Sequence, residues 1–209
     1  MCSVEETGVR SLPVSDSVWR MAGPTSLLLL AFTLAASEPI DEMFSAIREG
    51  KEGAVRRIIG ENKDTLGSFI NQRDPGSGQT PLMMAVLMGR EEAVAALLEE
   101  EQVDATVAEK DGYTPLHGAG FQGRAAIARR LLKDPRGLDP TVRHKDGFQP
   151  LHRACWGGEA RHAETVRVLV EEGGVPWDTK GKGRTCLQIT DNQATKTWLR
   201  EWGRARGEL

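Results

Sequence analysis

The chain has 209 residues, enough for one compact domain or for an array of short repeats with a tail. Apolar residues make up 39% of it and charged residues 27%, a balance that suits a chain folding around an apolar core. The 27 basic and 30 acidic residues give a net charge of −3 and form no long basic block, so we expect no nucleic-acid partner.

The first 37 residues differ in composition from the rest. Residues 1–20 are polar and show no period, whereas residues 27–36 are almost all apolar. This apolar run is too short for a membrane-spanning helix, which needs about 20 residues, but it matches the apolar part of a secretory signal. Arg20 precedes it, and the small residues 35–37 suit a cleavage site. We therefore expect a cleaved leader over residues 1–37, with a disordered extension as the alternative.

The localisation depends on that leader. Cleavage before Glu38 would send the mature chain into the secretory pathway, and without cleavage the chain would be cytoplasmic. The stretch before the apolar run is long and mixed in charge, unlike a simple signal, and a start at Met21 would remove it. A third hypothesis keeps the apolar run as a membrane tether, although we do not expect the membrane as a partner.

From residue 38 onward the sequence is self-similar. One phrase recurs at 80–83, 114–117, 149–152 and 185–188, as TPLM, TPLH, QPLH and TCLQ, with starts 34, 35 and 36 residues apart. A glycine follows nine residues after each of the first three starts, at Gly89, Gly123 and Gly158. An apolar doublet closes each following stretch, at 97–98, 131–132 and 169–170, and another lies at 58–59. Self-similarity at this period predicts stacked repeats.

Each repeat predicts a pair of helices. The threonine of the phrase is a good helix cap, and proline in the first turn loses no hydrogen bond that the helix needs. The recurring glycine suits the left-handed conformation that ends a first helix. An amphipathic second helix then packs its apolar doublet against the first. Such a pair cannot bury its apolar faces alone, so neighbouring pairs must stack.

The order and spacing of phrase, glycine and doublet resemble the ankyrin repeat, whose period is about 33 residues. The resemblance covers residues 38 to about 205. It implies an all-α solenoid of about five helix-turn-helix repeats with β-turn fingertips, at 38–74, 75–110, 111–145, 146–182 and 183–209. The first and last repeats depart from the phrase and fit terminal caps. The extra residues at 60–68 and 159–161 are expected to bulge at the surface.

The resemblance also implies structural roles for residues of the phrase. It places the imidazoles of His117 and His152 in hydrogen bonds to the backbone between neighbouring repeats, and it gives Gly89, Gly123 and Gly158 the helix-ending role. A catalytic histidine is the alternative, but neither histidine has a base or an orienting acid at a suggestive spacing.

The three cysteines, Cys2, Cys155 and Cys186, show neither a CxxC pair nor a zinc-ligand spacing, so we expect no metal and no cofactor. Cys155 follows His152 by three residues, which would allow a thiol nucleophile. We favour a core role, because the ankyrin unit usually has alanine there. A disulfide with Cys186 is a further alternative, and we disfavour it because the two residues are expected at different heights of adjacent first helices.

The residues expected to bind a partner lie two positions before each recurring glycine, where the ankyrin unit faces its concave side. These residues are Leu87, Phe121 and Trp156, framed by Arg48 and Asn192, with Met84, Met88 and Gln122 beside them. Exposed apolar and aromatic side chains mark partner sites and dominate binding hot spots. The alternative is that these side chains merely pack along the array.

The turn tips supply a second expected binding surface. Tyr113 and Phe148 occupy the same position of neighbouring fingertips, and Arg73 and Arg184 lie at others. The resemblance implies that fingertips and concave helices bind together. We therefore predict a monomeric, non-catalytic protein–protein interaction module, with an enzyme and a membrane-tethered array as the alternatives.

Overall fold

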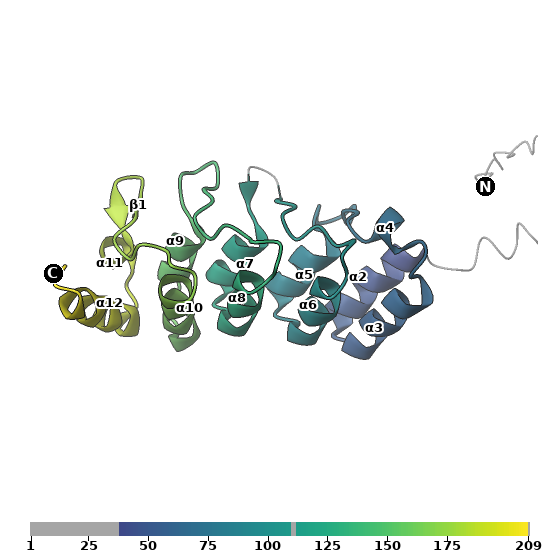
Figure 1. Ribbon diagram of the computed structural model, residues 1–209, viewed down its shortest axis with the longest axis horizontal. Helices are drawn as coiled ribbons and strands as arrows, with labels where there is room; N and C mark the ends of the chain where they lie inside the picture. Colours follow the sequence, from purple (N-terminus) through teal and green to yellow (C-terminus); the bar gives the residue numbers. More distant parts are fainter. Residues whose placement is uncertain (1–37, 110–111, 209) are drawn as a thin grey trace, which may run out of the picture. The chain divides into compact units, whose positions relative to one another are not determined.

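Paired helices follow one another along the chain in the computed structural model, which describes residues 38–109 and 112–208 (Figure 1). The pairs are α2 (Pro39–Glu49) with α3 (Glu52–Glu61), α5 (Pro81–Met88) with α6 (Glu91–Leu98), α7 (Pro115–Gln122) with α8 (Ala125–Leu132), α9 (Pro150–Cys155) with α10 (Ala160–Glu171), and α11 (Cys186–Ile189) with α12 (Gln193–Ala205). The predicted leader, residues 1–37, lies outside the described residues. None of the described helices combines the length and apolar character needed to cross a membrane.

The predicted capping signals act at the ends of the first helices. The Thr80 side chain accepts a hydrogen bond from the Met83 N–H, and Thr114 does the same for the His117 N–H. Helix α5 ends at Gly89 with φ of 70°, and helix α7 ends at Gly123 with φ of 66°. These left-handed conformations favour glycine and turn the chain into the second helix.

Gly158 does not have the helix-ending role that its spacing predicts. Helix α9 ends at Cys155, its C-cap Trp156 is right-handed, and Gly158 is absent from the left-handed glycines of the described chain. The chain leaves α9 early, and Gly157 then lies against the imidazole of His162. The expectation for Gly158 is therefore wrong, because this repeat connects its helices by a different path.

Part of each predicted insertion belongs to a helix. Residues 160–161 begin helix α10, which has 12 residues where α6 and α8 have 8. In the first repeat, residues 66–69 form the short helix α4 (Leu66–Phe69), whose Leu66 and Phe69 are buried. The extra residues lie at the surface as expected, since residues 159–161 and all of 60–68 except Asn62 and Leu66 are exposed, but parts of both insertions are helical and do not form loop bulges.

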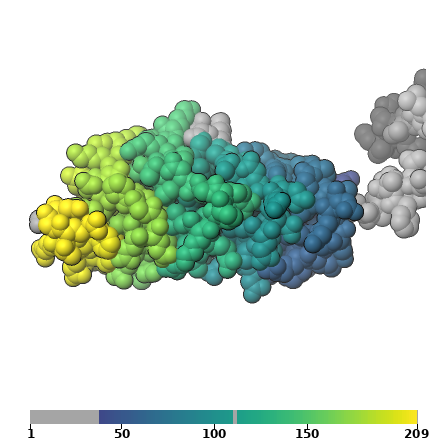
Figure 2. Space-filling model, in the orientation of Figure 1, coloured from purple at the N-terminus to yellow at the C-terminus, as the bar shows by residue number. Residues whose placement is uncertain are grey.

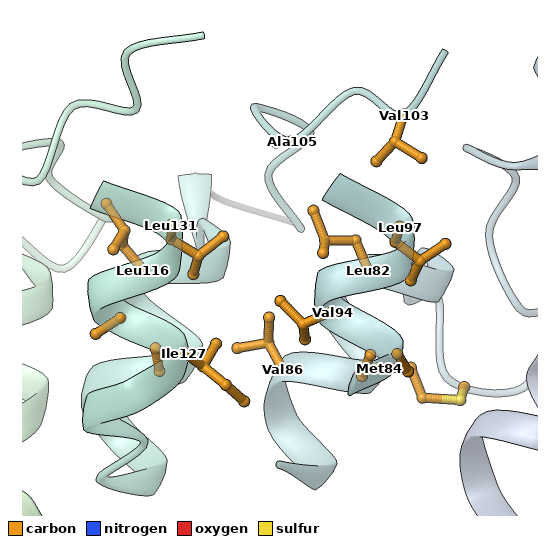
Figure 3. Packing of buried hydrophobic residues seen from close by; sticks show 14 of the residues in the cluster. Leu82, Met84, Val86, Val94, Leu97, Val103, Ala105, Leu116, Ile127 and Leu131 are labelled. Carbon is orange, nitrogen blue, oxygen red and sulfur yellow. The ribbon is translucent and has the colours of Figure 1, made fainter. Parts of the chain in front are cut away.

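Stacking of neighbours creates the core. First helices lie beside first helices, from α2 through α5, α7 and α9 to α11, and second helices stack likewise. Figure 3 shows Leu82, Val86 and Val94 of one pair facing Leu116 and Ile127 of the next. The buried apolar cluster extends from Met43 to Leu199. In the space-filling view the sequence colours follow one another in bands, as expected when each pair contacts mainly its neighbours (Figure 2).

The described fold is helix-rich, with a single short hairpin. Strands β1 (Lys180–Gly181) and β2 (Arg184–Thr185) pair antiparallel, with Lys180 opposite Thr185. This hairpin and the preceding inter-repeat loops project from the same edge of the helix array (Figure 1). These loops are the fingertips. The two arginines Arg73 and Arg143 link them, since each donates to a backbone carbonyl of the next fingertip, Ala108 and Lys180 respectively.

Cys155 and Cys186 form a disulfide. Their Cα atoms are 5.6 Å apart, within the usual range for this bond, and both residues are fully buried. The expectation that they lie at different heights is wrong, because α11 begins at Cys186, directly opposite the end of α9. The bond therefore fastens the last helix pair to the one before it.

Candidate functional site

Three large apolar side chains of the described chain are exposed, and all three come from the predicted concave row or its neighbours. Met88, Phe121 and Trp156 are 41%, 50% and 41% exposed. They lie at the C-terminal ends of the consecutive first helices α5, α7 and α9. Leu87 and Gln122 beside them are half-buried. We call these five residues the helix-end patch.

Of the residues expected to flank this row, Asn192 and Met84 are buried, and Arg48 is exposed. Asn192 is buried, caps helix α12, and donates hydrogen bonds to the carbonyls of Gly157 and Glu159 at 3.1 and 2.8 Å. Met84 is fully buried in the core. Both are inaccessible to a partner, so their expected places at the surface are wrong. Arg48 is exposed and forms an ion pair with Asp74.

A buried arginine supports the exposed end of the row. The guanidinium of Arg153 lies 4.6 Å from the ring centroid of Trp156, 5.4 Å from that of Tyr113 and 5.8 Å from that of Phe148. Arg153 as a whole residue is only 7% exposed. Its Nη2 donates to Asp146 Oδ2 at 2.5 Å and lies 3.0 Å from Nδ1 of His144. We call these six residues the Arg153 cluster.

Charge and burial fix the protonation states of Asp146 and Tyr113 in the Arg153 cluster. Burial opposes ionisation of Asp146, but hydrogen bonds from His144, from the Phe148 backbone and from Arg153 outweigh it and lower the pKa of Asp146 to about 2. Burial raises the pKa of Tyr113 to about 12, although the charge of Arg153 opposes this shift. At neutral pH the cluster therefore contains a charged carboxylate, a charged guanidinium and a neutral phenol.

The two fingertip aromatics are less exposed than the sequence predicts. Phe148 is 6% exposed, with its ring 4.9 Å from Trp156 and 5.6 Å from His152 between centroids. Gly181 of the next fingertip closes over it, and a Cβ at that position would collide with the ring. The expectation that Phe148 contacts a partner directly is wrong. Tyr113 is half-buried, and its hydroxyl donates to the His117 carbonyl at 3.3 Å.

The histidines of the phrase bridge neighbouring repeats. Nε2 of His117 lies 3.1 Å from the Phe148 carbonyl and that of His152 lies 3.2 Å from the Thr179 carbonyl, so each can donate to the next fingertip. Each Nδ1 accepts from the backbone N–H at the start of its own helix, at 3.2 Å. Burial lowers the pKa of His117 to about 4, so its imidazole is neutral at physiological pH.

Chemistry that needs a free thiol or a metal gains no support at this site. The sulfur of Cys155, considered above as a nucleophile beside His152, is bonded to Cys186. Within residues 38–109 and 112–208, no group of three or more His, Cys, Asp or Glu side chains could hold a metal ion.

The stacked helix pairs, the threonine caps and the left-handed glycines define a class of repeat protein. Residues 43–144 match the family model for ankyrin repeats (3 copies). This part of the chain therefore consists of ankyrin repeats. No curated protein matches it significantly.

Proposed function

We propose that the chain is a monomeric, non-catalytic interaction module, which binds a protein partner through the helix-end patch. Ankyrin repeats are generally protein–protein interaction modules. The single observation that carries the proposal is that Met88, Phe121 and Trp156 are exposed on consecutive first helices, whereas the other large apolar residues of the described chain are buried or half-buried. Aromatic anchors of this kind commonly provide most of the free energy of an interface.

Rigid presentation is the proposed mechanism. The Trp156 ring is held from below by Arg153 and from the side by Phe148, so it loses little rotamer freedom when a partner covers it. Cation–π contacts of this kind contribute about 0.5–2 kcal/mol each. The stacked array has few loose parts to order, which favours affinity from a few anchors.

We also infer that the binding array contains five repeats over residues 38–209. The family match covers residues 43–144, and two further helix pairs follow it. These pairs support the count because α9 stacks on α7, α10 on α8, and α12 on α10. In the last pair, Leu199 is buried and the rings of Trp198 and Trp202 stack at 5.2 Å, which supports its role as a cap.

The alternatives have weaker support. A membrane tether depends on residues 27–36, which lie outside the described residues. An enzyme needs a reactive group, and the thiol considered for that role is bonded in a disulfide. Neither alternative explains why three apolar side chains are aligned and exposed.

The test is a pull-down from native extract with the full chain, followed by affinity measurement for the captured partner. We expect Phe121→Ala with Trp156→Ala to weaken binding by at least about 2 kcal/mol, roughly 30-fold in Kd. Glu92→Ala with Arg130→Ala, at exposed positions of the second helices, is the matched control and should bind as wild type. Unchanged binding by the aromatic double variant, with circular dichroism showing an intact fold, would reject the proposal.

A further inference from the structure

The fingertips next to Trp156 carry unbalanced positive charge. Strands β1 and β2 and their turn present Lys180, Lys182 and Arg184, all exposed, and Arg143 of the preceding fingertip is exposed beside them. The only acid in residues 177–185 is Asp178. This local excess contrasts with a chain whose net charge is −3. We call these four cations the basic fingertip.

No cation of the basic fingertip forms an ion pair with a carboxylate in the described chain. Arg143 instead donates to the carbonyls of Gly147 and Lys180, at 2.7 and 2.9 Å. Ion pairs occur elsewhere, as between Arg56 and Glu99 or between Arg129 and Glu172. The nearby carboxylate of Asp146 is already bound by Arg153. The positive charge of the basic fingertip is therefore free to attract a partner.

The basic fingertip and the helix-end patch adjoin. Nζ of Lys182 lies 5.6 Å from the ring centroid of Phe148, and that ring lies 4.9 Å from the ring of Trp156. The hydrogen bond from His152 to the Thr179 carbonyl and the disulfide between Cys155 and Cys186 hold the hairpin's flanks to α9. The hairpin that carries three of the cations is thus held next to the exposed indole.

We propose that the partner presents an acidic segment of protein, with a large apolar side chain on Trp156 and carboxylates against Lys182, Arg184 and Lys180. This inference rests on the proposed function and specifies the chemistry of its ligand. Charge complementarity of this kind selects partners and accelerates association. An exposed charge pair changes affinity by up to about fivefold, so three pairs together can exceed tenfold.

The test selects peptide ligands from random sequences, so the natural partner need not be identified first. A library of twelve-residue peptides displayed on phage is panned against four forms of the full chain. These are wild type, Phe121→Ala with Trp156→Ala, the charge reversal Lys180→Glu with Lys182→Glu and Arg184→Glu, and a control reversal Lys63→Glu with Arg130→Glu and Arg200→Glu. The control residues are exposed and lie on separate helices or turns away from the hairpin. Enriched peptides are synthesised, and their Kd is measured at two salt concentrations.

The expected result is enrichment of aromatic or large aliphatic residues flanked by Asp and Glu. Binding should weaken at least about tenfold in the charge reversal, fall with added salt, and remain unchanged in the control reversal. Some peptides could need Trp156 for binding and yet lack acidic enrichment, or bind the charge-reversal form with the same Kd as wild type. Either result would overturn this inference and leave the proposed function intact. Failure to enrich any peptide that depends on Phe121 and Trp156 would count against both.

Two further probes distinguish other anionic ligands. A single-stranded thymidine oligonucleotide and phosphatidylserine vesicles are measured against the same four forms. We expect both to bind more weakly than the acidic peptides, and without dependence on Trp156. Tighter binding of either probe would overturn the inference in favour of a general polyanion surface.

Discussion

The ion pair between Arg153 and Asp146 allows a quantitative test of the Arg153 cluster. The guanidinium side chain is 8% exposed and the carboxylate side chain 30% exposed, so water screens the pair only partly. Hydrogen bonds to the carboxylate outweigh its burial and lower the pKa of Asp146 from 3.8 to about 2. A shift of this size corresponds to about 2 kcal/mol of folding stability when the carboxylate is charged.

The pH window follows from the direction of the shift. Because the pKa of Asp146 is lower in the folded state, its stabilisation is fully present above the unfolded value near 4 and is lost as the pH falls to about 2. Asp146→Asn cannot ionise, whereas the other carboxyl groups titrate in both proteins. We therefore expect wild type to lose about 2 kcal/mol more than the variant across this window. Urea denaturation at steps of pH measures the difference.

Arg153→Met removes the charge but keeps an apolar stem beneath Trp156. Breaking a fully buried ion pair costs about 3–5 kcal/mol, but partial exposure of Asp146 reduces this to about 2 kcal/mol here. For a chain of this size, that loss lowers Tm by roughly 4–8 °C. Arg130→Met, at an exposed position of α8, is the control and should leave Tm unchanged. Equal stability of the two methionine variants, or equal pH slopes of wild type and Asp146→Asn, would refute the reasoning.

Three other predictions concern the stack. Replacing Cys155 and Cys186 by alanine, or reducing the bond between them, should lower the free energy of unfolding by about 3–4 kcal/mol. This is the loop-closure value for a separation of 31 residues. Equal urea midpoints with and without reductant would contradict the prediction. Gly89→Ala should lower the free energy of unfolding by about 1–2 kcal/mol, because the residue has φ of 70°. Gly158→Ala should cost little, since Gly158 is not left-handed and a Cβ there meets open space. Equal changes in Tm for the two variants would contradict the helix-ending role of Gly89. Burial lowers the pKa of His117 from 6.5 to about 4, so the free energy of unfolding should fall as the pH drops through that window. The fall should be on the order of 3 kcal/mol larger in wild type than in His117→Gln. Parallel curves of unfolding free energy against pH would argue against a buried neutral imidazole.

The sequence predicts the helix pairs well because their signals are local. Thr80 and Thr114 cap helices within three residues of themselves, and Gly89 and Gly123 end those helices through their own φ angles. Such signals do not depend on distant contacts. The exposed residues Phe121 and Trp156 could be placed for the same reason, since their position within the unit follows from the glycine spacing.

Features that depend on neighbouring repeats could not be predicted in this way. Phe148 occupies an exposed type of position, but Gly181, more than 30 residues later, allows the next fingertip to cover it. The path that displaces Gly158 from its expected role depends on how α10 packs after its extra turn. In both cases, a contact made by stacking overrides the pattern within one unit.

Arg153 shows that a stacking contact can still leave a signal in the sequence. It directly follows the repeated phrase, at a position where the other units have Met84, Gly118 and Ile189. Met84 is fully buried, so an arginine there predicts either a buried charge with a partner or a departure from the stack. Comparison of equivalent buried positions between repeats therefore identifies the residue that the search for exposed anchors misses.

The buried arginine, the disulfide and the basic fingertip all lie at one end of the helix-end patch. Arg153 supports the indole of Trp156 from α9, and the bond from Cys155 to Cys186 fastens the following helix pair to the same helix. Met88, at the other end, is 41% exposed, and its flexible thioether side chain has no ring that could make a cation–π contact. Rigid, partly desolvated anchors contribute more to affinity than mobile ones, because less side-chain entropy is lost on binding. The free energy of binding should therefore be concentrated around Trp156, with Met88 contributing mainly by excluding water.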